Sequence, residues 1–215
     1  MYQLLLFDLD GTLTDPKEGI TKSFQYALAH FGIEESLDNL NRVIGPPLID
    51  SFMEYYGFDR ETGQKAVEKY RERFSALGIY ENALYPDVKE MLSALKKAGK
   101  TIALATSKPH VFAERILKHF EIYNYFNVIV GAELDGRLNY KNEIIAEVFR
   151  RLHFEQKETA IMIGDRKQDI AGAKQNGIAS LGVTFGYAEP GELEDAGADF
   201  LVNSVPELQD FLLQL

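Results

Sequence analysis

Three acidic residues follow a short apolar run near the start of the chain. Residues 4–7 read Leu-Leu-Leu-Phe, and Asp8, Asp10 and Asp15 come soon after them. Side chains two positions apart in an extended chain point the same way, so the first two carboxylates repel each other, and more so when partly buried. A bound divalent cation relieves this repulsion, and Mg²⁺ prefers such oxygen ligands. An Asp-Gly turn is the competing interpretation, and it leaves Asp8 unexplained.

A hydroxyl group follows a second apolar run. Residues 101–105 (TIALA) are followed by Thr106, Ser107 and Lys108. A hydroxyl and unpaired backbone N–H groups at this point suit a phosphoryl oxygen. A Thr-Ser pair is also an ordinary helix cap, so by itself it favours a structural role.

Two more acids follow a third run, 159–163 (TAIMI). Asp165 comes two residues after it, and Asp169 lies four residues further on; helix capping is the competing role for both. Lys141 lies in the loop before a helical pattern led by Ile144, where a lone lysine is normally solvated. Acids and a hydroxyl that each follow a different apolar run indicate one shared site more strongly than any of them alone.

These residues meet only if the runs are strands that end at one edge of a sheet. Short apolar runs alternate with helical patterns, which predicts an α/β fold with a parallel sheet and helices on both faces. In such sheets ligands bind beyond the carboxyl ends of the strands. The predicted strands are 4–7, 101–105, 127–130, 159–163, 179–183 and 200–202, and a last helix spans about 206–213.

Residues 16–77 interrupt this alternation, because their apolar residues recur at helical spacing and show no clear strand. We therefore expect an all-helical domain of residues 16–81, inserted into a core domain of residues 1–15 and 82–215.

The amino-acid composition limits the classes of molecule that this protein is expected to bind. Hydrophobic residues make up 46% of the chain, enough for a substantial core, and the net charge of -10 disfavours nucleic acid polymers and anionic membranes. An anionic substrate would need local cations. The absence of cysteine excludes disulfides and cysteine nucleophiles. No apolar run is suited to a signal peptide or a membrane span, so we expect a cytoplasmic protein. We also expect a monomer or a weak homodimer.

The segment FDLDGTLTD resembles the first signature of the haloacid dehalogenase (HAD) superfamily of phosphatases. LATSKP, Lys141 and GDRKQD follow in the order of the other three signatures, and the resemblance covers essentially the whole chain. It implies a Rossmann-like parallel sheet core with an inserted helical cap domain. Within the superfamily, the sequence is most similar to phosphoglycolate phosphatase-like hydrolases, whose predicted members include 5′-nucleotidases.

The resemblance implies a role for each acid. Asp8 would attack phosphorus and form an aspartyl-phosphate, and Asp10 would serve first as general acid and then as general base. Mg²⁺ would be held by Asp8, the backbone carbonyl of Asp10, and Asp165. Asp169 would support the ion through water or a neighbouring ligand.

The resemblance also implies roles for the remaining polar residues. Thr106 and the amide of Ser107 would bind phosphoryl oxygens, and Lys141 would neutralise nucleophile and phosphate. The family often has a proline after this lysine, where this chain has asparagine, so Lys108 is a possible substitute. Arg166 replaces a commonly small residue and could reach substrate or pair with the nearby Asp169.

The cap would close over the site and select substrates. Gly45 and Pro46 lie in a break between two of its predicted helices and are expected to form a rigid loop that faces the site and contacts substrate. A simple helix breaker explains them equally well.

The expected activity is hydrolysis of a small soluble phosphate ester, with phosphoglycolate phosphatase as the model and 5′-nucleotidase as the alternative. A sugar phosphomutase of the same superfamily shares both aspartates and stays open. A phospho-accepting or phosphate-binding module, such as a receiver domain, also uses an acidic cluster on a parallel sheet. Such a module would not need an insertion of about sixty residues, which is far beyond ordinary loop lengths.

Overall fold

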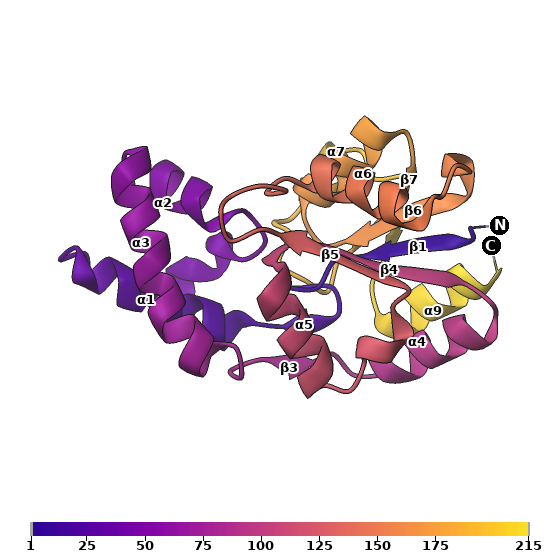
Figure 1. Cartoon of the computed structure of the whole chain (residues 1–215), viewed down its shortest axis with the longest axis horizontal. Helices are drawn as coiled ribbons and strands as arrows, with labels where there is room; N and C mark the ends of the chain where they lie inside the picture. The colour runs from indigo at the N-terminus through magenta and orange to yellow at the C-terminus, as the bar shows by residue number, and fades with distance from the viewer. Residues whose placement is uncertain (1, 215) are drawn as a thin grey trace. The chain divides into compact units, whose positions relative to one another are not determined.

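The computed structural model describes residues 2–214, which form two compact units (Figure 1). Unit 1 contains the residues before Pro16 and after Ala83, and unit 2 contains Pro16–Ala83. The chain thus leaves unit 1 once and returns to it once.

Unit 1 is built on a six-stranded sheet in the order β5-β4-β1-β6-β7-β8, in which each strand is parallel to its neighbours. The carboxyl ends of the strands therefore share one edge, called the carboxyl edge below. The strands are β1 (Leu4–Phe7), β4 (Thr101–Pro109), β5 (Val128–Ala132), β6 (Ala160–Gly164), β7 (Ala179–Val183) and β8 (Phe200–Val202).

Helices cover both faces of this sheet. In Figure 1, α6 and α7 lie on one side, and α4, α5 and α9 lie on the other. The helices of unit 1 are α4 (Val88–Lys97), α5 (His110–His119), α6 (Lys141–Leu152), α7 (Lys167–Asn176), α8 (Glu192–Asp195) and α9 (Val205–Gln214), with short helical turns at Tyr123–Tyr125 and Lys157–Thr159. The predicted α/β class with a Rossmann-like parallel core is confirmed.

The central strand explains the apolar run at the start of the chain. All four residues of β1 are fully buried, because β4 and β6 flank the strand and helices cover both its faces. Leu4 and Leu6 pack into the cluster that contains Ile144 and Val148 of α6. A strand buried on both faces has no solvent side, so its sequence is apolar at every position.

The second predicted strand, 101–105, is too short. β4 continues to Pro109, and its pairing with β5 shifts register between Thr106 and Pro109. The Thr-Ser pair is consequently part of an irregular strand end and does not cap a helix, since α5 begins only at His110.

Unit 2 consists mainly of three helices around an aromatic core. The rings of Phe24 and Phe52 stack at a centroid distance of 4.0 Å, and Phe58 lies 5.9 Å from Phe52. The helices are α1 (Lys17–His30), α2 (Leu48–Tyr56) and α3 (Arg60–Arg73), with a 3-10 helix at Leu37–Val43 and a π-helical turn at Phe74–Gly78. The short strands β2 (Thr14–Asp15) and β3 (Ala83–Leu84) form a separate two-stranded sheet.

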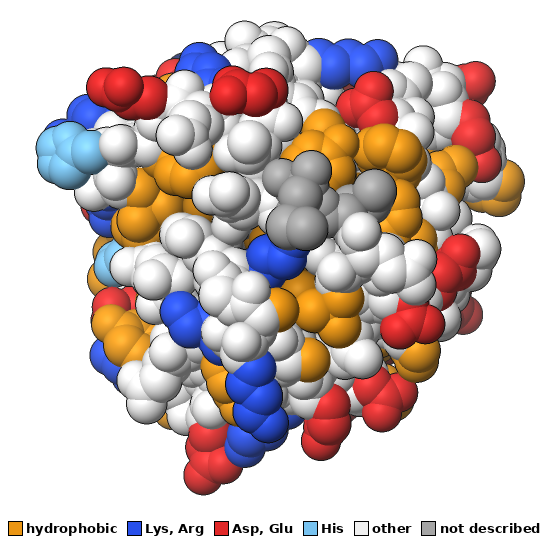
Figure 2. Space-filling model, turned by 90° about the vertical axis from the view of Figure 1, so that its right-hand side faces the viewer, with side chains coloured by type: hydrophobic (Ala, Val, Ile, Leu, Met, Phe, Trp, Pro, Cys, Tyr) orange, Lys and Arg blue, Asp and Glu red, His pale blue; other side chains and the backbone are white. Residues whose placement is uncertain are grey.

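Residues 2–214 include no helix that is long and apolar enough to cross a membrane. On the face of unit 1 seen in Figure 2, acidic side chains, basic side chains and small apolar areas are mixed. Neither observation tests the expected cytoplasmic location, which stays a prediction.

Replacing Leu6 with alanine should lower the free energy of unfolding by about 2–5 kcal/mol, because it leaves a cavity in the centre of the sheet. Leu134→Ala is the matched control, since this leucine is 48% exposed and should change stability by less than about 0.5 kcal/mol. Urea denaturation of both variants measures the difference, and equal losses would contradict the central position of β1.

Candidate active site

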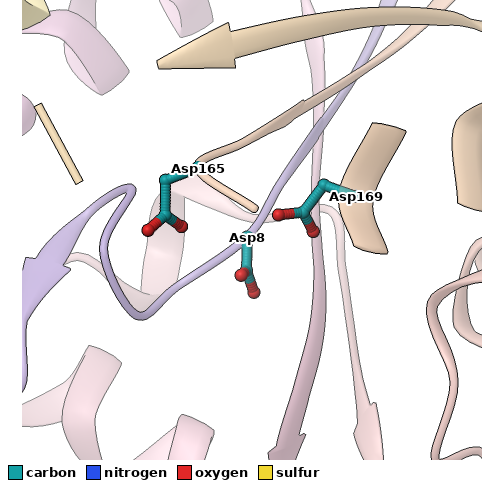
Figure 3. A group of neighbouring side chains, drawn as sticks. All are labelled: Asp8, Asp165 and Asp169. Atoms are coloured by element: carbon teal, nitrogen blue, oxygen red, sulfur yellow. The ribbon is translucent and has the colours of Figure 1, made fainter. Parts of the chain in front are cut away.

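Three buried carboxylates meet at the carboxyl edge of the sheet (Figure 3). Asp8 directly follows β1, Asp165 directly follows β6, and Asp169 lies in the first turn of α7. One oxygen from each lies within 4.8 Å of the others. The parallel topology places β1 and β6 side by side, so their ends bring these residues together from distant parts of the sequence.

A buried lysine bridges two of these acids. Lys141, the first residue of α6, places its Nζ 2.7 Å from Asp8 Oδ1 and 2.7 Å from Asp169 Oδ1, and donates to the backbone oxygen of Ala105 at 2.8 Å. Burial alone would lower the pKa of Lys141, but the carboxylates of Asp169 and Asp8 outweigh burial and raise it. The ammonium group therefore stays charged beside Asp8.

The second aspartate has a separate cation. Lys108 Nζ lies 2.7 Å from Asp10 Oδ2, and both side chains are buried. Burial raises the pKa of Asp10, while the charge of Lys108 opposes the rise. Asp10 Oδ1 is buried and accepts no hydrogen bond from residues 2–214. The alternative that Lys108 replaces Lys141 beside Asp8 is thus not what the structure shows, because the two lysines serve different acids.

The hydroxyl of Thr106 is buried at the end of β4. Its Oγ1 accepts the backbone N–H of Lys108 at 3.2 Å, which leaves the hydroxyl hydrogen able to donate. Ser107, between them, is half-buried.

Both oxygens of Asp165 accept hydrogen bonds inside the protein. Tyr187 donates its backbone N–H to Oδ2 at 2.8 Å, and Thr12 donates its hydroxyl to Oδ1 at 3.2 Å. Neither donor has a role predicted from the sequence. Thr12 lies within the FDLDGTLTD segment and could have been found there, whereas Tyr187 follows β7 in a loop that carries no motif.

The side chain of Arg166 forms an ion pair that the sequence did not indicate, and the contact with substrate left open by the sequence stays a prediction. Its Nε lies 2.9 Å from Glu192 Oε1, at the start of α8. It is the backbone N–H of Arg166 that donates to Asp169 Oδ2, at 3.1 Å. The side chain therefore ties the loop after β6 to α8.

The charges of the site favour a divalent cation. Four buried carboxyl groups face two buried ammonium groups, so acids outnumber cations in the cluster. Burial and the charges of Asp169 and Asp8 raise the pKa of Asp165 well above its ordinary range. Oxygen donors with this excess charge fit Mg²⁺ or a similar hard ion.

Gly45 and Pro46 belong to unit 2, between the 3-10 helix and α2, and both are half-buried. Their expected contact with substrate stays a prediction.

A family model described as haloacid dehalogenase-like hydrolase matches residues 5–183. This chain belongs to that family. It is therefore an enzyme, and the phosphatase names of its relatives support a phosphomonoester hydrolase. A 5′-nucleotidase of Pseudomonas aeruginosa is 48% identical to it over 193 residues, which cover 89% of this chain and 87% of that protein. A phosphoglycolate phosphatase of Vibrio vulnificus is 31% identical over 220 residues, covering 98% and 96% of the two chains.

Solved structures of other family members share the fold. The crystal structure of a predicted phosphatase from Clostridium acetobutylicum has a TM-score of 0.97 and 49% identity to this chain, with complete coverage of both. Protein tyrosine kinase A of Mycobacterium tuberculosis has a TM-score of 0.84 and 35% identity, with 98% of each chain covered. One fold thus carries relatives named for hydrolysis and for kinase activity.

Replacing Asp165 with asparagine should raise the free energy of unfolding of the metal-free hydrolase by about 1–3 kcal/mol, because it removes a buried charge that two neighbouring carboxylates repel. Thermal unfolding in chelator measures this gain. Added Mg²⁺ should raise the melting temperature of the native chain and not that of the variant. The exposed Asp210→Asn is the control; a destabilised Asp165→Asn protein would contradict mutual repulsion within the cluster.

Proposed function

We propose that this hydrolase is a Mg²⁺-dependent phosphatase that cleaves a small phosphomonoester through an aspartyl-phosphate on Asp8. The supporting observation is the pairing of Asp8 with Lys141 at the carboxyl edge, beside a second acid with its own cation. Lys141 places a positive charge 2.7 Å from the carboxyl group that would act as the nucleophile. Its oxygen would attack phosphorus as the bond to the leaving alkoxide breaks.

Asp10 is assigned the proton transfers. Burial raises its pKa, which favours a protonated carboxyl able to give its proton to the leaving oxygen. In the second half-reaction the resulting carboxylate would take a proton from water as the water oxygen attacks phosphorus. The bond between Asp8 and phosphorus then breaks, which releases inorganic phosphate and restores both aspartates.

Asp8, Asp165 and the backbone carbonyl of Asp10 would hold Mg²⁺, with Asp169 in support. The ion, when bound, supplies positive charge that offsets the phosphoryl oxygens. Thr106 and the amide of Ser107 would bind those oxygens, and Lys141 and Lys108 would supply the local cations that a chain of net charge -10 otherwise lacks.

Two substrate classes are supported by relatives. A relative named phosphoglycolate phosphatase is 31% identical and aligns over nearly the whole chain, whereas a relative named 5′-nucleotidase is 48% identical over a slightly shorter stretch. The higher identity supports nucleoside monophosphates as the first alternative to phosphoglycolate. We assign the choice between them to residues of unit 2, with Gly45 and Pro46 as candidates.

The first experiment is phosphate release from phosphoglycolate, nucleoside monophosphates, sugar phosphates and an aryl phosphate, with Mg²⁺ and with chelator. Asp8→Asn should lower kcat by roughly 10⁴-fold or more, because the amide oxygen is a poor nucleophile. Release that needs metal and Asp8 supports the proposal. Activity in Asp8→Asn would remove the nucleophile assignment, and transfer of the phosphoryl group to a sugar or a tyrosyl peptide would replace hydrolysis with a mutase or kinase reaction.

Asp10→Asn should lower kcat by about 10²–10⁴-fold, the usual contribution of general acid-base catalysis. The loss in kcat/KM, which reports formation of the aspartyl-phosphate only, should be smallest for the aryl phosphate, because its leaving group needs little help from an acid. Parallel kinetics with alkyl and aryl substrates measure this contrast. Equal losses for both would assign Asp10 a role other than protonation of the leaving group.

A further inference from the structure

The loop after β7 lies directly against the side chain of Asp165. A Cβ atom at Gly186 would lie 2.4 Å from Asp165 Cβ and 2.4 Å from the backbone oxygen of Gly11. A Cβ atom at Gly11, where φ is +83°, would lie 2.0 Å from Asp165 Oδ2. The carboxylate therefore occupies a slot between two glycines that a residue with a side chain would obstruct.

The same loop supplies a hydrogen bond to the slot. The residue after Gly186 is Tyr187, whose backbone N–H donates to Asp165 Oδ2 at 2.8 Å, while Thr12 donates to Oδ1 at 3.2 Å. The direction of the carboxylate thus depends on where the backbone of Tyr187 is held.

The phenol of Tyr187 holds that backbone. It donates to Asp15 Oδ1, and the neighbouring Phe185 meets the ring of Tyr85 edge-on at a centroid distance of 5.3 Å. Burial and the carboxylate of Asp15 raise the pKa of Tyr187, so the phenol keeps its proton and remains a donor. Asp15 is the last residue before the chain enters unit 2, and Tyr85 is the second residue after it returns.

We propose that Tyr187 is a positioning residue for the metal site, because its phenol, held by Asp15, fixes the loop whose backbone N–H orients Asp165. This inference rests on the proposed function, in which Asp165 holds the metal ion. Partners that orient metal ligands commonly change metal affinity by about 10–100-fold when removed. Tyr187→Phe keeps the ring and the backbone N–H and removes only the phenolic O–H, so its effect should be smaller.

The test is direct binding of Mn²⁺ to the folded protein, followed by electron paramagnetic resonance. Tyr187→Phe should bind Mn²⁺ about three- to tenfold more weakly than the native chain. Its kcat at saturating Mg²⁺ should stay within about twofold, because the reacting groups are untouched. Tyr125→Phe is the matched control, since Tyr125 precedes β5 and therefore lies at the opposite edge of the sheet.

Asp15→Ala removes the acceptor of the same hydrogen bond, and it provides a second test if Tyr187→Phe fails to fold. Asp15→Ala should weaken Mn²⁺ binding by a similar factor. The double variant, Tyr187→Phe with Asp15→Ala, should bind Mn²⁺ no more weakly than either single variant. Asp15→Asn should restore the affinity, because its amide oxygen can accept the same hydrogen bond. Native Mn²⁺ affinity in Tyr187→Phe, or effects that multiply in the double variant, would overturn the inference. A native chain that binds Mn²⁺ without releasing phosphate would instead count against the proposed function alone.

Discussion

The repulsion among buried carboxylates at the carboxyl edge is the constraint on which the arrangement of the site depends. Four acids gather where β1 and β6 end, and their charges stay compatible with burial only through specific partners. Lys141 reaches across from α6 to two of them, and Lys108 reaches a third from the irregular end of β4. Such clusters reduce stability and are retained where their charge is used.

The backbone around the site follows from the same constraint. The two oxygens of Asp165 are met by neutral donors from Thr12 and Tyr187. Those donors reach it only because Gly11 and Gly186 lack side chains. The loops after β1, β6 and β7 therefore pack together around a single carboxylate, although they are far apart in the sequence.

Much of this architecture could be predicted from the sequence. The continuous apolar runs identify β1 and its neighbours because a doubly covered strand must be apolar throughout, and the acids that follow them identify the edge at which a ligand would bind. The roles taken from the resemblance, such as those of Asp10 and Thr106, remain proposals, although the structure places the residues near one another.

Other features depend on tertiary contacts that no local pattern contains. The extension of β4 through Pro109 is fixed by pairing with β5, so the propensity of a Thr-Ser pair to cap a helix is overridden. The partner of Arg166 is Glu192, 26 positions away, and nothing in the sequence around either residue indicates the pair. No sequence pattern indicates the role of Tyr187 either, because that role depends on its backbone N–H and on a hydrogen bond to a distant aspartate.

In the proposed mechanism Asp8 carries the phosphoryl group during turnover. The most direct test of this step is to mix the hydrolase with a substrate identified by the phosphate-release panel, quench the reaction in acid during steady-state turnover, and map the modified peptide by mass spectrometry. Phosphoryl transfer through Asp8 predicts a phosphoryl group on the peptide that contains Asp8, in an acyl linkage that borohydride reduces to homoserine. Turnover with no such adduct, or with the phosphoryl group on another residue, would contradict it.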